Sequence, residues 1–434
     1  MKNLIRFIYN NNVRVKGGVL LKNISLLLML LLVLPYFISY KIVFLGLILY
    51  LLIQLIFYRF SINFVLLGTL LPLILIFFIG LLSSIYGMPF YNDLIRDIIF
   101  YLMPILLITT GYIISIKIKD ISLIINTVVW SGIILSVYHL HHFVLNPSLL
   151  GESIRQIRLE AGLGFTLTIL SLFIIYFSKS FDMKILNNNS KIKTFGFIVC
   201  SISGLLSFSR SLIIFSLVIL LILSISKRKY VIKSYLSLAL TIFMILILIP
   251  TIHFSVPEEA YEQMSGKLVN SLNEVSITEF DSIKQINENW RGYEAYRSQI
   301  DFLDKSFIAQ IFGGGFGERI PLGLSIQLSG EIYTSVPIVH NGFWNLLNKV
   351  GVSGLLLYIV FIISILKLGL KLVKKEGYQV KLIGYLSFII AAFVFISTLL
   401  ATGLYKSQGT TELSILIGLF IGIDYCLLSK KIVN

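Results

Sequence analysis

The chain has 434 residues, of which 57% are hydrophobic and only 13% are charged, and its formal net charge is +15. Soluble domains usually carry about 25% charged residues, so this composition excludes a soluble globular domain, a disordered chain and a disulfide-based scaffold. Cys200 and Cys426 both lie in apolar segments, which indicates core or lipid-facing residues rather than a disulfide bridge or a metal site. The sequence therefore indicates a polytopic membrane protein.

Apolar stretches recur along the whole chain. A helix needs roughly 20 apolar residues to cross the hydrocarbon core of a bilayer. We predict an all-α polytopic membrane protein with about twelve transmembrane helices, at 23–39, 42–58, 61–85, 97–116, 121–143, 160–178, 194–208, 211–226, 234–252, 341–366, 380–401 and 411–428. The membrane domain then comprises 1–252, with the first nine spans, and 340–434, with the last three.

The charges are distributed unevenly between the two predicted sides of the membrane. If the N-terminus is cytoplasmic, 23 of the 36 basic residues but only four of the 21 acidic residues lie on the cytoplasmic side. This asymmetry follows the positive-inside rule, so we expect both chain ends in the cytoplasm. Because the basic residues then face anionic lipid, the net positive charge predicts no nucleic-acid partner.

Arg155 and Arg158 lie in a predicted external loop and are candidates for binding an anionic substrate. They follow His139, His141 and His142. No acidic or cysteine partner stands at ligand spacing from these histidines, so no metal site is predicted.

Arg210 stands between two apolar runs, in the sequence Ser209-Arg210-Ser211, at the predicted external membrane edge. An arginine at that depth is costly unless it is paired or faces water. A guanidinium group suits bidentate binding of phosphate. The alternative is an arginine whose head extends to the lipid headgroups.

Residues 253–339 form a polar segment between the ninth and tenth spans, and we predict a large external loop there. The spacing of apolar residues over 290–311 predicts that it is partly helical. Arg291 and Arg297 in this part are candidate substrate-binding residues, although an ordinary solvated charge is the alternative. The glycines of 312–317 would let the backbone approach a sugar or phosphate closely, but no βαβ context surrounds them, so they make no dinucleotide fingerprint.

His340 and Asn341 are predicted to lie at the external N-terminus of a spanning helix. That end carries unpaired N–H groups and partial positive charge, which favours a nearby phosphate and a neutral imidazole able to accept a proton. A capping asparagine beside an interfacial histidine is the alternative. Lys349, about two turns further on, needs a partner and has a packing, gating or binding role.

The stretch from His340 to Gly354 resembles the signature of the bacterial O-antigen polymerase and ligase family: His-Asn, nine residues, then Gly-x-x-Gly at the start of a span. That family also has about twelve spans and a large periplasmic loop before the motif. It has an arginine in a Ser-Arg pair on an earlier external turn, matched by Arg210, and a loop arginine before a Gly-rich turn. Arg291 is the best match to the loop arginine, and Arg297 is its rival.

The resemblance implies glycosyl transfer at the periplasmic face of the bacterial inner membrane, from an undecaprenyl-diphosphate-linked glycan. Neither a metal nor another cofactor is then required, because the lipid diphosphate is the leaving group. His340 would be the general base, Arg210 and Arg291 would hold the diphosphate, and Asn341 would orient the acceptor hydroxyl. A chain-length regulator and a flippase in the same membrane are the implied protein partners.

Four functions remain possible, two within this family and two of other classes. A polymerase, which we favour, transfers the growing glycan to another lipid-linked repeat unit, whereas a ligase transfers the finished glycan to lipid A-core. A lipid-linked glycan transporter would carry more charges inside its spans and show two related halves. A non-catalytic membrane scaffold would leave Arg210 and His340 without a role. The sugar, the linkage and the oligomeric state do not follow from the sequence.

Overall fold

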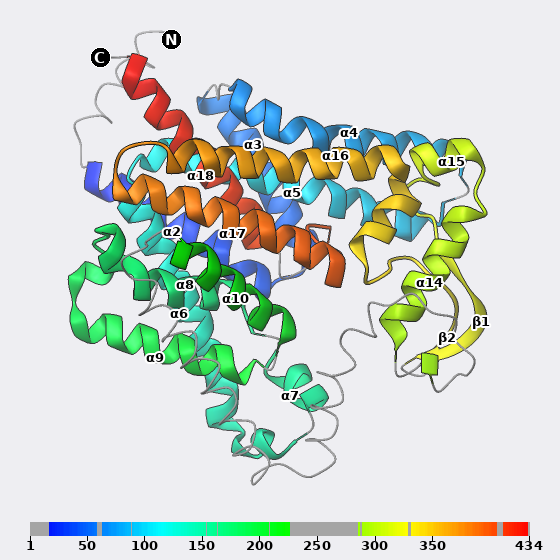
Figure 1. Ribbon diagram of the computed structural model, residues 1–434, viewed down its shortest axis with the longest axis horizontal. Coiled ribbons are helices and arrows are strands. Elements are labelled where there is room, and N and C mark those ends of the chain that lie inside the picture. The colour runs from blue at the N-terminus through cyan, green and yellow to red at the C-terminus, as the bar shows by residue number, and fades with distance from the viewer. Residues whose placement is uncertain are drawn as a thin grey trace.

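The computed structural model describes residues 17–58, 63–87, 89–152, 154–162, 164–207, 209–225, 285–286, 289–328, 331–405 and 411–432. This part of the chain is mostly helical, and most helices pack lengthwise into one bundle (Figure 1). The helices are α2 Gly17–Val33, α3 Tyr40–Tyr58, α4 Phe64–Tyr86, α5 Tyr91–Ile118, α6 Ile121–Leu145, α7 Ile154–Glu160, α8 Thr166–Phe177, α9 Ser190–Leu206, α10 Arg210–Ile225, α14 Trp290–Leu303, α15 Phe307–Phe312, α16 Gly342–Val373, α17 Tyr378–Leu400 and α18 Thr411–Ile432. Four short 3₁₀ turns and two strands, β1 Ile320–Leu328 and β2 Glu331–Val336, complete it.

Seven helices of the described part are long and apolar enough to cross a membrane, namely α3, α4, α5, α6, α16, α17 and α18. The helices α2, α8 and α10 contain shorter apolar runs. Each predicted span overlaps a described helix except 234–252, which lies outside the described residues. These helices confirm the prediction of a mostly helical protein with several potential membrane spans.

Several predicted boundaries differ from the structure, and two of the differences change the local architecture. The predicted span 160–178 is interrupted, because α7 ends at Glu160 and α8 begins only at Thr166. Gly162 and Gly164 lie between them with φ of 89° and 72°, a backbone conformation that ends a right-handed helix and favours glycine. The other difference is that α5 begins at Tyr91 instead of residue 97, so its first turns carry charged residues.

The helices α5 and α18 pack closely at the centre of the bundle. A Cβ atom at Gly111 of α5 would lie 2.2 Å from the carbonyl oxygen of Ile415, and one at Gly418 of α18 would lie 2.0 Å from that of Ile108. Small residues at such positions allow two helix backbones to approach. This contact forms part of the large apolar core shared by the spanning helices.

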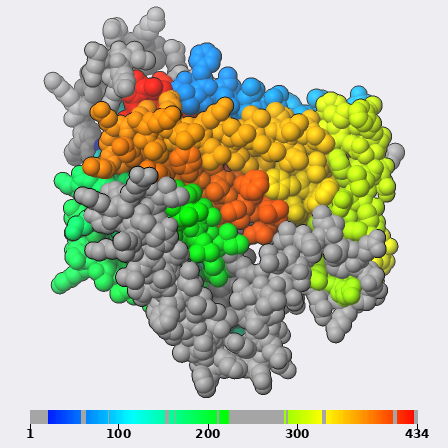
Figure 2. Space-filling model, in the orientation of Figure 1, coloured from blue at the N-terminus to red at the C-terminus, as the bar shows by residue number. Residues whose placement is uncertain are grey.

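The helices α14 and α15 and the antiparallel hairpin β1–β2 lie together at one end of the bundle, called the hairpin end below (Figures 1 and 2). Tyr293 of α14 packs on the hairpin and shares a small separate core with Ile320, Leu322 and Val336. The partly helical character of the loop was predicted, but the hairpin was not. The strand pairing is irregular between Pro321 and Ile326. Apolar residues occupy every second position of β1 from Ile320 to Leu328, so the period of a strand was present in the sequence, but Pro321 and Gly323 are residue types depleted in strands and weakened that signal.

Candidate functional site

His340 and Glu294 form a hydrogen-bonded pair at the hairpin end. The Nδ1 atom of His340 lies 2.6 Å from Oε2 of Glu294, and the backbone N–H of His340 donates to the same oxygen at 3.1 Å. The Glu294 side chain is 3% exposed, whereas the His340 side chain is 50% exposed. A carboxylate can only accept at this contact, so a neutral His340 ring carries its proton on Nδ1 and its lone pair on Nε2. In this tautomer, Nε2 of the half-exposed ring is the nitrogen that can accept a proton.

The local sequence explains where each partner stands. The helix α16 begins directly after Asn341, whose Oδ1 accepts from the backbone N–H of Phe343 at 3.1 Å and of Trp344 at 3.3 Å. Asn341 is thus an N-cap, the alternative considered from the sequence, and its predicted contact with an acceptor hydroxyl stays a prediction. Glu294 lies next to Tyr293 on the buried side of α14.

Glu294 was not singled out from the sequence, although a signal was present. It follows Trp290 by four residues, so both lie on one side of α14, and both pack toward the interior. A carboxylate on the buried side of an amphipathic helix requires a hydrogen-bond or ionic partner. The pattern alone does not identify that partner, which comes from 46 residues away.

The two candidate loop arginines have different surroundings. Arg291 is exposed and precedes Glu294 by three residues on α14, so the two are neighbours on the helix surface. Arg297 donates from Nε to the carbonyl oxygen of Pro321 at 3.3 Å, and its guanidinium group lies against Gly323 of β1. Arg297 therefore contacts the hairpin and has a structural role there. This favours Arg291 as the loop arginine of the candidate site.

Arg210 is the first residue of α10, and its side chain lies outside the described part of the structure. The helix packs against α17, with the rings of Phe215 and Phe393 4.1 Å apart. At the end of α17, the carbonyl oxygen of Ala401 accepts from the N–H of Gly342, at the start of α16, at 2.6 Å. The helix α17 thus contacts both α10 and the start of α16. The approach of the Arg210 side chain to His340 stays a prediction.

Arg155 and Arg158 belong to α7, which packs through Ile157 on Phe143 and Leu149. The Arg155 side chain lies outside the described residues, and the Arg158 side chain is half-buried. Their predicted contact with substrate stays a prediction.

The histidine cluster of α6 shows no metal-binding arrangement. His139 is fully buried, and its Nδ1 lies 3.0 Å from the hydroxyl of Ser203 on α9. Within the described part of the chain, no group of three or more histidine, cysteine, aspartate or glutamate side chains is arranged to hold a metal ion.

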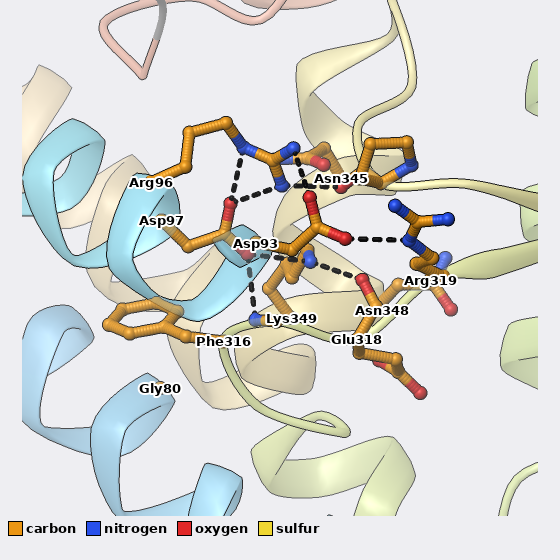
Figure 3. Close-up of polar contacts among 12 residues, drawn as sticks. Gly80, Asp93, Arg96, Asp97, Phe316, Glu318, Arg319, Asn345, Asn348 and Lys349 are labelled. Atoms are coloured by element: carbon orange, nitrogen blue, oxygen red, sulfur yellow. Dashed lines mark hydrogen bonds and ion pairs between the residues drawn. The ribbon is translucent and has the colours of Figure 1, made fainter. Parts of the chain in front are cut away.

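A charged network joins α5, α16 and the segment before the hairpin (Figure 3). Asp97 accepts from Lys349 Nζ at 2.7 Å and from Arg96 at 2.8 Å. Arg96 also pairs with Asp93 at 2.7 Å, and Asp93 accepts from Arg319 at 2.6 Å. The side chains of Lys349 and Asp97 are 1% and 3% exposed. Lys349, whose role the sequence left open, therefore has an ionic partner in the interior.

The Gly-rich turn 313–317 is docked onto the helices. The N–H groups of Gly314 and Gly315 donate to the carbonyl oxygens of Asn348 and Lys349, at 2.8 and 3.0 Å. A continuous helix would pair these carbonyls with amides four residues on, but α16 breaks at Gly351, where φ is 67°. Because of the break, these two carbonyl oxygens are available to accept hydrogen bonds from the N–H groups of the turn.

This docking changes the interpretation of the glycines. A Cβ atom at Gly313 would lie 2.3 Å from the backbone of Lys349, and one at Gly315 would lie 2.4 Å from the backbone of Ser84 on α4. The glycines allow close approach to the protein's own helices, whereas the sequence suggested close approach to a sugar or phosphate. At the edge of the turn, burial raises the pKa of Glu318, and the Lys305 ammonium at 2.8 Å opposes part of that shift.

Comparison with models of known protein families and with curated protein sequences finds no match for this chain.

Proposed function

We propose that the chain is a multi-pass glycosyltransferase of the bacterial inner membrane, a polysaccharide polymerase of the O-antigen polymerase and ligase type. It would have about twelve spans, with both chain ends cytoplasmic and residues 253–339 in the periplasm. The observation that carries the proposal is the His340–Glu294 pair, because it gives the first residue of the His-Asn-x₉-Gly-x-x-Gly pattern the geometry of a general base.

The proposed reaction joins two lipid-linked glycans. An acceptor sugar hydroxyl attacks the anomeric carbon of the donor while its proton passes to Nε2 of His340. The bond between the anomeric carbon and the diphosphate oxygen breaks, and its electron pair stays on that oxygen. The direct attack inverts the anomeric centre, and undecaprenyl diphosphate leaves.

Charge develops at two places during this reaction. Glu294 accepts from Nδ1 of His340 and stabilises the imidazolium that forms when Nε2 takes the proton. The departing diphosphate gains negative charge, which preplaced cationic groups stabilise. We assign that role to Arg291, exposed one turn before Glu294 on α14, and to Arg210 at the start of α10.

Product analysis with the purified protein and an undecaprenyl-diphosphate-linked repeat unit tests this function. We expect lipid-linked glycans of two or more repeats together with free undecaprenyl diphosphate. Transfer of the glycan to added lipid A-core would instead identify a ligase. Movement of the lipid-linked glycan across vesicles without a new glycosidic bond would identify a transporter and contradict the proposal.

A further inference from the structure

The segment between His340 and the break in α16 carries the candidate base at its start. At Gly351 the backbone leaves the helical conformation, so residues 340–350, called the motif segment below, are not aligned by a continuous helix with the rest of α16. Their orientation has to be set by side-chain and backbone contacts. The break also accounts for the nine-residue spacing of the pattern, because residues 342–350 form one short helical segment between Asn341 and Gly351.

The motif segment is attached to α14 at two points. His340 contacts Glu294, and Asn348 donates from Nδ2 to the hydroxyl and the carbonyl oxygen of Ser298 at 2.7 and 3.0 Å. Because Glu294 and Ser298 are four residues apart, both attachments lie on one side of α14. These contacts hold the two helical segments together as one body.

Asp97 attaches this body to the bundle, in addition to the hydrogen bond between Gly342 and Ala401. Its Oδ2 accepts from Lys349 Nζ at 2.7 Å and from the backbone N–H of Gly317 at 2.9 Å, and its Oδ1 accepts from Arg96. One buried carboxylate of α5 thus holds both the motif segment and the Gly-rich turn (Figure 3). A buried ion pair is weak evidence for stability, because apolar side chains of similar volume often stabilise equally well.

We propose that Lys349 and Asp97 are positioning residues, whose ion pair fixes the motif segment against α5 so that His340 meets the reacting hydroxyl. The proposal rests on the proposed function. Displacement of a reacting group by about 1 Å can cost roughly a hundredfold in rate, so a pair that adds little stability can still determine turnover.

The neutral pair Asp97→Asn with Lys349→Met separates positioning from stability. Asp97→Asn alone leaves the Lys349 ammonium buried without its carboxylate, so thermal stability should fall, and the double variant should restore it. We expect the double variant to lose about tenfold or more in kcat, while KM for the lipid-linked donor changes less than about threefold. A control at a buried carboxylate elsewhere in the bundle is Asp424→Asn with Lys371→Met and Lys375→Met, because Asp424 pairs with both lysines, at 2.6 and 2.7 Å. This variant should leave kcat within about twofold.

Hydrogen exchange gives a readout that does not depend on activity. In the double variant, the amides of Gly314, Gly315 and Gly317 should exchange faster than in the unmodified protein. The carbonyl groups that accept from Gly314 and Gly315 lie in the motif segment and move with it, and the carboxylate that accepts from Gly317 is replaced by an amide. If the double variant fails to fold, Lys349→Gln, which keeps a donor toward Asp97, should show the same changes at smaller size. Unmodified kcat in the folded variant would overturn the proposal. Unchanged exchange would overturn it even if the unmodified protein transfers no glycan, an outcome that would separately contradict the proposed function.

Discussion

His340 and His139 show two ways in which this protein uses a histidine. His340 is half-exposed and donates to a buried carboxylate, whereas His139 is fully buried, lies beside the Ser203 hydroxyl and packs on the rings of Phe143 and Phe165. A carboxylate stabilises an imidazolium, but a hydroxyl in an apolar setting does not. Exposure also lets a reacting group reach the ring. The comparison shows that a histidine is identified as the candidate base by its hydrogen-bond partner and its exposure, and not by its residue type alone.

Replacing each histidine by alanine tests this contrast and should give the largest effect. His340→Ala should lower turnover by at least tenfold, because general bases contribute about 10²–10⁴-fold, with little change in thermal stability. His139→Ala should instead lower the free energy of unfolding by about 1–3 kcal/mol through the space left in the core. Rates per folded molecule and melting curves in detergent measure both. Near-normal polymer length in cells with His340→Ala would contradict the assignment.

The partner of the exposed histidine gives the next largest effect. Glu294→Gln keeps the shape of the side chain but removes the charge that orients and stabilises the His340 ring. We expect kcat to fall by about 10–100-fold, with folding intact. The exposed Asp304 at the end of the same helix offers a matched control, and Asp304→Asn should change kcat by less than about twofold. Equal effects of the two variants would remove Glu294 from the mechanism.

Local signals predicted the helices well, and tertiary contacts decided the rest. The apolar runs predicted the positions of α3 to α6 and α16 to α18, because a helix that crosses a membrane needs a long run of apolar side chains around its hydrogen-bonded backbone. They also locate His340 at the start of a helix. The pairing of His340 with Glu294, and of Lys349 with Asp97, joins residues 46 and 252 positions apart. No local pattern selects such partners. The hairpin was missed although apolar residues occupy every second position of β1, because the proline and the glycine between them are residue types depleted in strands.

Arg291 and Arg297 are expected to have different roles near His340, one in binding the diphosphate and one in holding the hairpin. Arg291→Ala should lower turnover about tenfold without a change in stability, because the side chain is exposed and we assign it to the diphosphate. Arg297→Ala should chiefly loosen the hairpin, with a loss of about 1 kcal/mol in the free energy of unfolding. Donor titrations and melting curves of both variants measure these effects. The reverse pattern would assign the diphosphate to Arg297.

The partner of the buried histidine should give the smallest effect. Ser203→Ala removes the hydroxyl beside Nδ1 of His139 and should cost about 1 kcal/mol of stability, as for a single neutral hydrogen bond. Turnover should stay within about twofold of the unmodified protein. A loss of turnover as large as that of Glu294→Gln would show that both histidines serve the chemistry, and the contrast between them would be wrong.

The initial rate of undecaprenyl diphosphate release tests the central claim most directly, measured with purified unmodified protein, His340→Gln and Glu294→Gln at saturating donor and acceptor. If the His340–Glu294 pair takes the acceptor proton, both variants should release the lipid diphosphate at least about tenfold more slowly than the unmodified protein while melting at the same temperature. Release by His340→Gln at the rate of the unmodified protein would contradict the account.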